Sequence, residues 1–117
     1  MHKEFDIRKR TLIYSVEVIS FFKKEKKYDF IEQIVVRQLI RAVTSIGANV
    51  QEAKGAHSPK DYHNFFCIAL KSANEAIYWF SIIAQTGSSN LGKILEFKME
   101  ADEISKIIAS CIIKMRK

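Results

Sequence analysis

Residues 94–115, ILEFKMEADEISKIIASCIIKM, carry the most regular apolar pattern in the chain. Their apolar side chains recur at alternating steps of three and four residues. An α-helix places such positions along one side, so this stretch predicts an amphipathic helix whose heptad-like seam packs against neighbouring helices. The seam consists of Ile94, Phe97, Ala101, Ile104, Ile108, Cys111 and Met115.

Three further stretches of helical length precede this one. Two of them, residues 6–24 and 30–54, carry apolar side chains at helical spacing. The third begins at a helix start signal, because Ser58 suits the N-cap and Pro59 suits the first helical position. Gly87 suits the left-handed turn that ends such a helix. The breaks between the stretches are residues 23–27, 55–59 and 87–90.

The composition favours a single helical domain. The chain has 117 residues, of which 48% are hydrophobic, with four Gly and one Pro. That apolar fraction excludes a disordered chain. So few turn residues argue against a β-sandwich or barrel, which needs a turn about every 8–12 residues. We therefore predict one all-α domain over residues 1–117, an antiparallel up-down-up-down four-helix bundle.

The sequence also bears on location. No apolar run approaches the roughly 18–20 residues of a membrane-spanning helix, and the first residues do not lead into the apolar core of a secretory signal. Cys67 and Cys111 are 44 positions apart among apolar residues, which favours small buried side chains over a disulfide or a reactive thiol. We therefore predict a cytoplasmic protein with no membrane attachment.

The basic residues are concentrated near the two ends of the chain. Nineteen Lys and Arg against thirteen Asp and Glu give a net charge of +6, with +4 in residues 1–27 and +2 in residues 88–117. The first and last helices of an up-down bundle are neighbours, so the pattern predicts one basic face that binds nucleic-acid phosphates. The alternative, that these residues only keep the protein soluble, stays open. The candidates are Arg8, Lys9, Arg10, Lys23, Lys24, Lys26, Lys27, Lys114, Arg116 and Lys117.

A second pair of candidates lies in the predicted second helix. Arg37 and Arg41 are one turn apart and can point the same way. They suit binding to phosphates or to a partner's carboxylates, although pairing with Asp or Glu of a neighbouring helix is an alternative. Trp79 is predicted in the core or at an interface, because aromatic side chains on a rigid helix seldom splay nucleic-acid bases.

Polar and small residues interrupt the predicted second helix. Gly47 costs about 1 kcal/mol relative to Ala in a helix interior, and close approach of a neighbouring helix is the simplest compensation. Ser45, Asn49 and Glu52 share one face. We predict that they form a buried polar network that fixes helix register. The alternative is a ligand-binding or catalytic pocket between the helices. The polar counterparts in the third helix are Lys71, Ser72, Asn74 and Glu75.

The sequence presents no recognisable catalytic, metal or cofactor motif. His57 and His63 are six residues apart, which does not place both on one helix face. A metal site built from these two and Asp61 is a minor alternative. There is no Gly-rich phosphate loop and no nucleophile elbow. We therefore expect no catalytic residues, no bound metal and no cofactor.

The middle of the chain resembles a known family. Residues 38–49 with Glu52-Ala53, and then residues 58–62, 68–76 and 78–79, look like the signature of the small four-helix-bundle proteins of the 23S ribosomal RNA intervening-sequence family. The resemblance implies a bacterial protein that assembles into a ring, commonly a pentamer. It also implies kinship with the basic accessory protein of diversity-generating retroelements, which partners a reverse transcriptase and binds nucleic acid. The family has no assigned catalytic residues.

We therefore expect a non-enzymatic, oligomeric basic bundle that binds RNA or DNA backbone as an accessory or scaffold. The apolar stripe of residues 6–24 is wider than one core face requires, which suggests surface for a neighbouring subunit. An alternative is an interaction module that docks a partner such as a polymerase without binding nucleic acid itself. An enzyme with a pocket around Asn49, Glu52 and Glu75 is the least favoured possibility.

Overall fold

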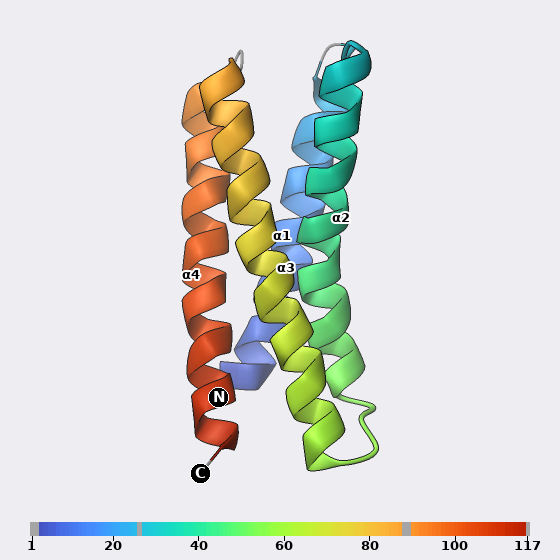
Figure 1. Ribbon diagram of the computed structural model, residues 1–117, viewed down its shortest axis with the longest axis vertical. Coiled ribbons are helices and arrows are strands. Elements are labelled where there is room, and N and C mark those ends of the chain that lie inside the picture. Colours follow the sequence, from blue (N-terminus) through green and yellow to red (C-terminus); the bar gives the residue numbers. More distant parts are fainter. Residues whose placement is uncertain (1–2, 26, 88–89, 117) are drawn as a thin grey trace.

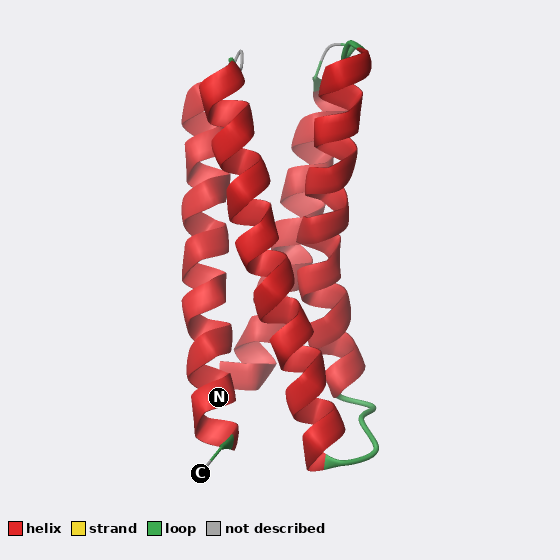
Figure 2. Ribbon diagram, in the orientation of Figure 1, coloured by secondary structure: helices red, strands yellow, loops and turns green. Residues whose placement is uncertain are grey.

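Four helices account for nearly all of the chain. The computed structural model describes residues 3–25, 27–87 and 90–116, and these residues contain no strand (Figure 2). The predictions of an all-α fold and of four helices are confirmed. The helices are α1 (Lys3–Lys24), α2 (Phe30–Ala53), α3 (Pro59–Thr86) and α4 (Leu91–Met115).

The helices lie side by side along the long axis of a molecule measuring 46 × 22 × 20 Å. Figure 1 shows that the chain reverses direction at each of its three connections and that both termini lie at one end. We call this the terminal end, and the opposite end, where α1 meets α2 and α3 meets α4, the open end. Over the described residues, α1 packs against α2 and α4, and α3 packs against the same two helices.

Local side-chain chemistry sets where the helices begin. Asp29 and Glu32 form a capping box at the start of α2, in which each side chain accepts a hydrogen bond from the other residue's backbone N–H. The Ser58 hydroxyl accepts a hydrogen bond from the Asp61 N–H at 3.0 Å, with Pro59 as the first residue of α3. Gly87 follows α3 with a φ of 101°, in the region that favours glycine.

The core is built from one seam on each helix. In α4 all seam residues from Ile94 to Cys111 are buried, and Met115 is half-buried. In α1 the core face includes Tyr14, Val18 and Phe22, and the apolar residues on its other side are left in solvent. The exposed apolar residues of α1 are Leu12, Ile13 and Val16.

At Gly47 the helices α1 and α2 lie so close that a side chain there would collide with α1. A Cβ built on Gly47 would lie 3.2 Å from the Thr11 Oγ1 and 3.3 Å from its Cβ. The Thr11 hydroxyl cannot turn away easily, because it is buried and donates to the Ile7 carbonyl oxygen at 2.8 Å. Glycine therefore allows α1 to rest against α2, and this contact compensates for its low helix propensity.

Gly47→Val is expected to lower the free energy of unfolding by roughly 2–3 kcal/mol, because the added atoms must push Thr11 and α1 away from α2. Urea denaturation followed by circular dichroism measures this change. The control is Gly92→Ala in α4, where a Cβ meets nothing within 4 Å and a gain of about 0.5 kcal/mol is expected. Equal stability of the Gly47 variant and the parent would contradict the steric argument.

Candidate nucleic-acid interface

The predicted basic residues divide between the two ends of the bundle. Lys23, Lys24 and Lys27 are exposed at the open end. Lys9 is exposed near the terminal end, fourteen residues or about 21 Å along α1 from Lys23. Lys114 and Arg116 at the end of α4 are exposed there too, and Arg8 is half-buried in the first turns of α1. Lys26 and Lys117 lie outside the described residues.

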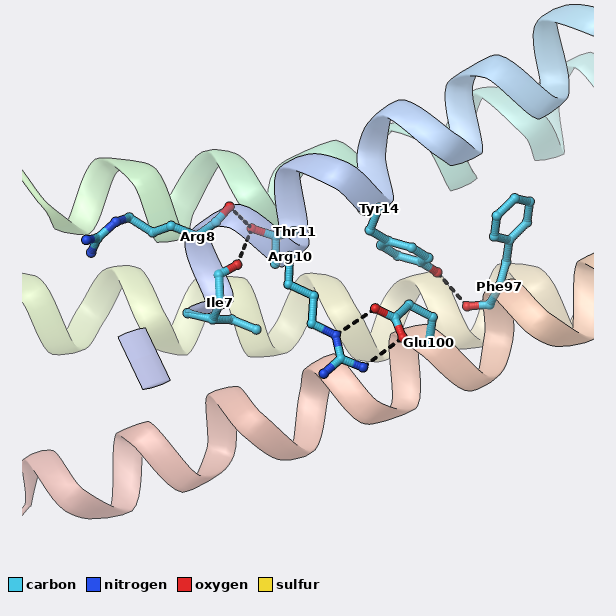
Figure 3. Close-up of polar contacts among 7 residues, drawn as sticks. All are labelled: Ile7, Arg8, Arg10, Thr11, Tyr14, Phe97 and Glu100. Atoms are coloured by element: carbon cyan, nitrogen blue, oxygen red, sulfur yellow. Dashed lines mark hydrogen bonds and ion pairs between the residues drawn. The ribbon is translucent and has the colours of Figure 1, made fainter. Parts of the chain in front are cut away.

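Arg10 is engaged within the bundle. Its Nε and Nη2 donate to the two carboxylate oxygens of Glu100 at 2.7 and 2.8 Å, which ties α1 to α4 (Figure 3). The hydrogen bond to Glu100 raises the pKa of Arg10 above its ordinary value. Because a bidentate carboxylate already occupies Nε and Nη2, Arg10 is less available to a phosphate than the exposed basic residues that form no ion pair.

Tyr14 provides a second tie between the same helices. Its hydroxyl donates to the Phe97 carbonyl oxygen at 2.6 Å, one turn along α4 from Glu100 (Figure 3). Its ring is buried and meets the Phe97 ring edge to face, with 6.2 Å between centroids. Burial, with the negative charge of Glu100 in support, raises the pKa of the Tyr14 hydroxyl above its ordinary value.

Arg37 and Arg41 lie together on the outer side of α2. Both are exposed, and within the described part of the chain neither forms an ion pair. They border a shallow depression of about 420 Å³ that also includes Tyr28, Gln33 and Ile40. Two free guanidinium groups one turn apart beside an amide and an aromatic ring suit a polyanion better than an apolar ligand.

The small and polar residues of α2 meet α3 in a short hydrogen-bonded chain. The Ser45 and Ser72 hydroxyl oxygens are 2.8 Å apart. Asn49 Nδ2 donates to the Ser45 carbonyl oxygen at 2.8 Å and to its hydroxyl at 3.1 Å. No buried side-chain nitrogen or oxygen among the described residues lacks a partner. The three side chains therefore satisfy one another between α2 and α3.

The carboxylates assigned to this region point elsewhere. Glu52 is exposed and borders a depression at the α2–α3 connection whose lining includes neither Asn49 nor Glu75. Glu75 is exposed and accepts a hydrogen bond from Trp79 Nε1 at 3.1 Å. Lys71 and Asn74 are exposed as well. The residues of the suggested pocket are thus not brought together between the inner helices.

The histidines do not assemble a metal cluster. Across the described ranges, no group of three or more His, Cys, Asp and Glu side chains is placed to hold a metal ion. Asp61 accepts a hydrogen bond from the His57 backbone N–H at 3.2 Å. His63 lies beside Cys67, with 3.7 Å between Nδ1 and Sγ, a contact that their spacing of four residues predicts but that our sequence analysis missed.

The sequence analysis also missed an apolar cleft at the open end. It has a volume of about 610 Å³ and lies between the end of α1, the start of α2 and the end of α3. Charged side chains at its edge are Glu25, Lys27, Asp29 and Glu32. The available signal was the apolar content of residues 30–36, which the sequence reading treated only as part of a helical pattern over residues 30–54. Its apolar walls include Phe21, Phe22, Ile31, Val35, Ile82 and Ile83.

The fold and its surface define a small all-helical bundle protein with exposed cations at both ends. The sequence model of the family described as 23S rRNA-intervening sequence protein matches residues 3–110. The chain therefore belongs to that family, and the resemblance noted in its sequence is confirmed.

A solved structure supports the same assignment. It is a crystal structure of a protein with unknown function from the S23 ribosomal protein family from Bacteroides thetaiotaomicron VPI-5482. It is 30% identical, with a TM-score of 0.83, and the match covers 95% of this chain and 98% of that chain. Among curated proteins, none matches the chain. Over the described residues, none of the four helices has the length and apolar character needed to cross a membrane.

The Arg10–Glu100 pair is expected to contribute about 1 kcal/mol to stability, because both side chains are about one-third exposed and solvent screens their attraction. A double-mutant cycle with Arg10→Gln and Glu100→Gln measures this coupling by urea denaturation. The coupling should shrink in 1 M salt. A coupling near zero at low salt would show that the pair does not hold α1 to α4.

Alkaline pH is expected to destabilise the bundle through Tyr14 and Tyr28. Burial, with Glu25 and Glu32 in support, raises the pKa of Tyr28 to about 12, and the pKa of Tyr14 is raised as well. The folded state therefore holds these protons more tightly than the unfolded state, in which tyrosine ionises near pH 10. The resulting stability is complete below about pH 10 and is lost as the pH rises toward 12.

Unfolding free energies measured between pH 8 and 12 test this dependence. Tyr14→Phe should lower stability at pH 8 by about 1 kcal/mol through loss of its hydrogen bond and should flatten the alkaline decline. An unchanged decline in the Tyr14 variant would be evidence against a raised pKa at this position.

Proposed function

We propose that the protein is a non-enzymatic accessory or scaffold protein that binds the backbone of RNA or DNA. The observation that carries this proposal is the set of exposed cations that make no ion pair within the described part of the chain. Arg10, Lys93 and Lys106 each form an ion pair within the chain, with Glu100, Glu96 and Asp102, and are set aside. The remaining candidates are Lys9, Lys23, Lys24, Lys27, Arg37, Arg41, Lys114 and Arg116.

The arrangement of these cations favours backbone binding over base reading. Lys and flexible Arg side chains at a helix surface bind phosphates as point charges and release counterions from the nucleic acid. Such binding is strongly dependent on salt and nearly independent of sequence. Lys23, Lys24 and Lys27 gather at the open end, whereas Arg37 and Arg41 lie further along the outer side of α2, toward its middle.

We further propose that the antiparallel bundle assembles into a ring of identical subunits, for which the family resemblance suggests a pentamer. The exposed apolar residues of α1 support assembly, because a surface of this kind in a small bundle is commonly covered by a neighbour. A ring repeats each cationic group around its axis, so one nucleic-acid strand meets several of them. The cytoplasm is the proposed location, which suits Cys67 and Cys111, since neither forms a disulfide.

Filter-binding titrations of an RNA duplex from 50 to 300 mM salt test the nucleic-acid proposal. The affinity should fall steeply as salt rises, with a log–log slope of about −0.9 for each phosphate contact. Replacing Lys23, Lys24 and Lys27 with Glu should weaken binding more than tenfold at low salt and flatten the slope by about three contacts.

The matched control replaces Lys54, Lys60 and Lys71 with Glu. These lysines are exposed and lie outside the candidate interface, so the net charge changes equally while the interface is kept. The control should lose much less affinity. Absence of binding by the parent protein at low salt, or an equal loss in both variants, would overturn the assignment of this interface.

A further inference from the structure

An exposed aromatic side chain and two arginines line up along the outer side of α2. Phe30, the first residue of the helix, is 74% exposed. Arg37 follows it by seven residues and Arg41 follows Arg37 by four, so the three side chains share one face of the helix. Both arginines are exposed, and neither forms an ion pair with another described residue. We call these three residues the α2 outer face.

The α2 outer face adjoins the shallow depression of about 420 Å³ that the two arginines border. Tyr28, in the connection just before α2, forms part of its wall, and Val36 and Ile40 add apolar surface. The Tyr28 hydroxyl donates to the Phe22 carbonyl oxygen at 3.4 Å, which ties this side chain to the end of α1. Aromatic surface, apolar surface and two cations therefore lie together.

The charge changes along this surface. Asp29 and Glu32 lie at the start of α2, where each accepts a hydrogen bond from the backbone N–H of the other. The end of α1 and the α1–α2 connection add charges of both signs, namely Lys23, Lys24, Glu25 and Lys27. Residues 33–51, in contrast, contain no Asp or Glu. The aromatic end is therefore mixed in charge, whereas the arginine end is positive.

We infer that the α2 outer face holds a single strand of nucleic acid through its bases as well as its phosphates, with phosphates at Arg37 and Arg41 and bases against Phe30 and Tyr28. This inference rests on the nucleic-acid binding proposed above and names the class of strand. Every base has a flat face that an aromatic side chain can cover, and a single strand leaves that face accessible. A duplex keeps its bases stacked and paired, so it offers phosphates to the arginines but no base to Phe30.

The dimensions of the face suit a short strand. Phe30 and Arg41 are eleven residues apart, which is about 16 Å along a helix. Stacked nucleotides rise about 3.4 Å each, so roughly four or five of them span this length. Arg37 and Arg41, about 6 Å apart along the axis, can bind phosphates of nearby nucleotides while the bases turn toward the aromatic end.

Tyr78 provides an internal comparison, because it is also an exposed aromatic side chain. It is 60% exposed on α3. Lys71 and Glu75 precede it by seven and three residues and share its face, so their charges cancel. Tyr78 therefore lacks the pair of cations that would hold a strand beside it, which makes it a matched control for Phe30.

Fluorescence anisotropy with three labelled DNA probes tests this inference: a single strand, the same strand with abasic sugars, and the duplex. The parent should bind the single strand at least about fivefold more tightly than the abasic strand, because stacking of one base changes affinity by that factor or more. Phe30→Leu keeps an apolar side chain but removes the aromatic face, so it should abolish this difference and leave the affinities for abasic strand and duplex unchanged. Tyr78→Leu should keep the difference.

A second variant tests the arginine end separately. Arg37→Gln with Arg41→Gln should weaken the binding of all three probes and flatten the salt dependence for the single strand by about two contacts, at about 0.7 in the log–log slope for each. Because all the substituted residues are exposed, circular dichroism should show every variant folded.

The outcomes separate this inference from the proposed function. No binding of any probe at low salt would overturn both. Salt-dependent binding with equal affinity for the single strand and the abasic strand would overturn the contact with bases and leave backbone binding standing. A base-dependent affinity that survives Phe30→Leu would overturn the assignment to this face. Light scattering covers the remaining case, since a lower mass of the Phe30→Leu variant would show that Phe30 contacts another copy rather than a base.

Discussion

The structure depends on the burial of one apolar seam from each helix against two neighbours. The seam of α4 is buried from Ile94 to Cys111, and α1 and α3 are the two helices that cover it. Loss of either helix would expose part of the seam to water. Apolar burial contributes roughly 25 cal/mol for each Å² removed from water, and it has no direction of its own. Register must therefore come from contacts with fixed geometry, and these lie where the helices pair.

Contacts of this kind join three pairs of helices. Gly47 lets α1 lie close to α2, because a larger residue would collide with Thr11. Ser45 and Ser72 join α2 to α3 through a hydroxyl pair. Arg10 and Tyr14 join α1 to α4 through Glu100 and the Phe97 carbonyl oxygen. Each contact is specific in distance and direction, so together they select one alignment from the many that apolar packing would tolerate.

Sequence reasoning succeeded where the signal was local. The apolar spacing of α4, the capping residue Ser58 and the turn residue Gly87 act within a few residues, and each lies where it was expected. The fate of a surface charge depends on residues far along the chain. Arg10 was assigned to a basic face, yet its partner Glu100 is ninety residues away. Helical periodicity gives the side of a helix on which a residue lies but not the residue opposite it.

The open-end cleft is a second feature that helical periodicity alone does not reveal. Ile31 and Val35 have the spacing of core residues, and in a bundle closed at both ends they would be buried. Instead Ile31 is exposed and Val35 is only half-buried, because the helix pairs stand apart at one end. That separation is a property of the four helices together rather than of any one of them. An apolar pattern therefore predicts that a residue will be covered, but it does not say whether the cover comes from the same chain.

The proposed ring and the proposed phosphate contacts draw on different side chains of this bundle. The exposed α1 residues Leu12, Ile13 and Val16 are apolar, whereas Arg37 and Arg41 lie on the outer side of α2 and form no ion pair in the described part of the chain. Closing a ring through apolar contact removes little charge, so the positive field of the copies adds up around the axis. In the proposed ring, phosphate contacts that are weak on one bundle would add up to strong binding, because each further contact by the same strand is intramolecular. In such a ring the exposed apolar residues, which hold the copies together, would determine the affinity for nucleic acid as much as the cations do.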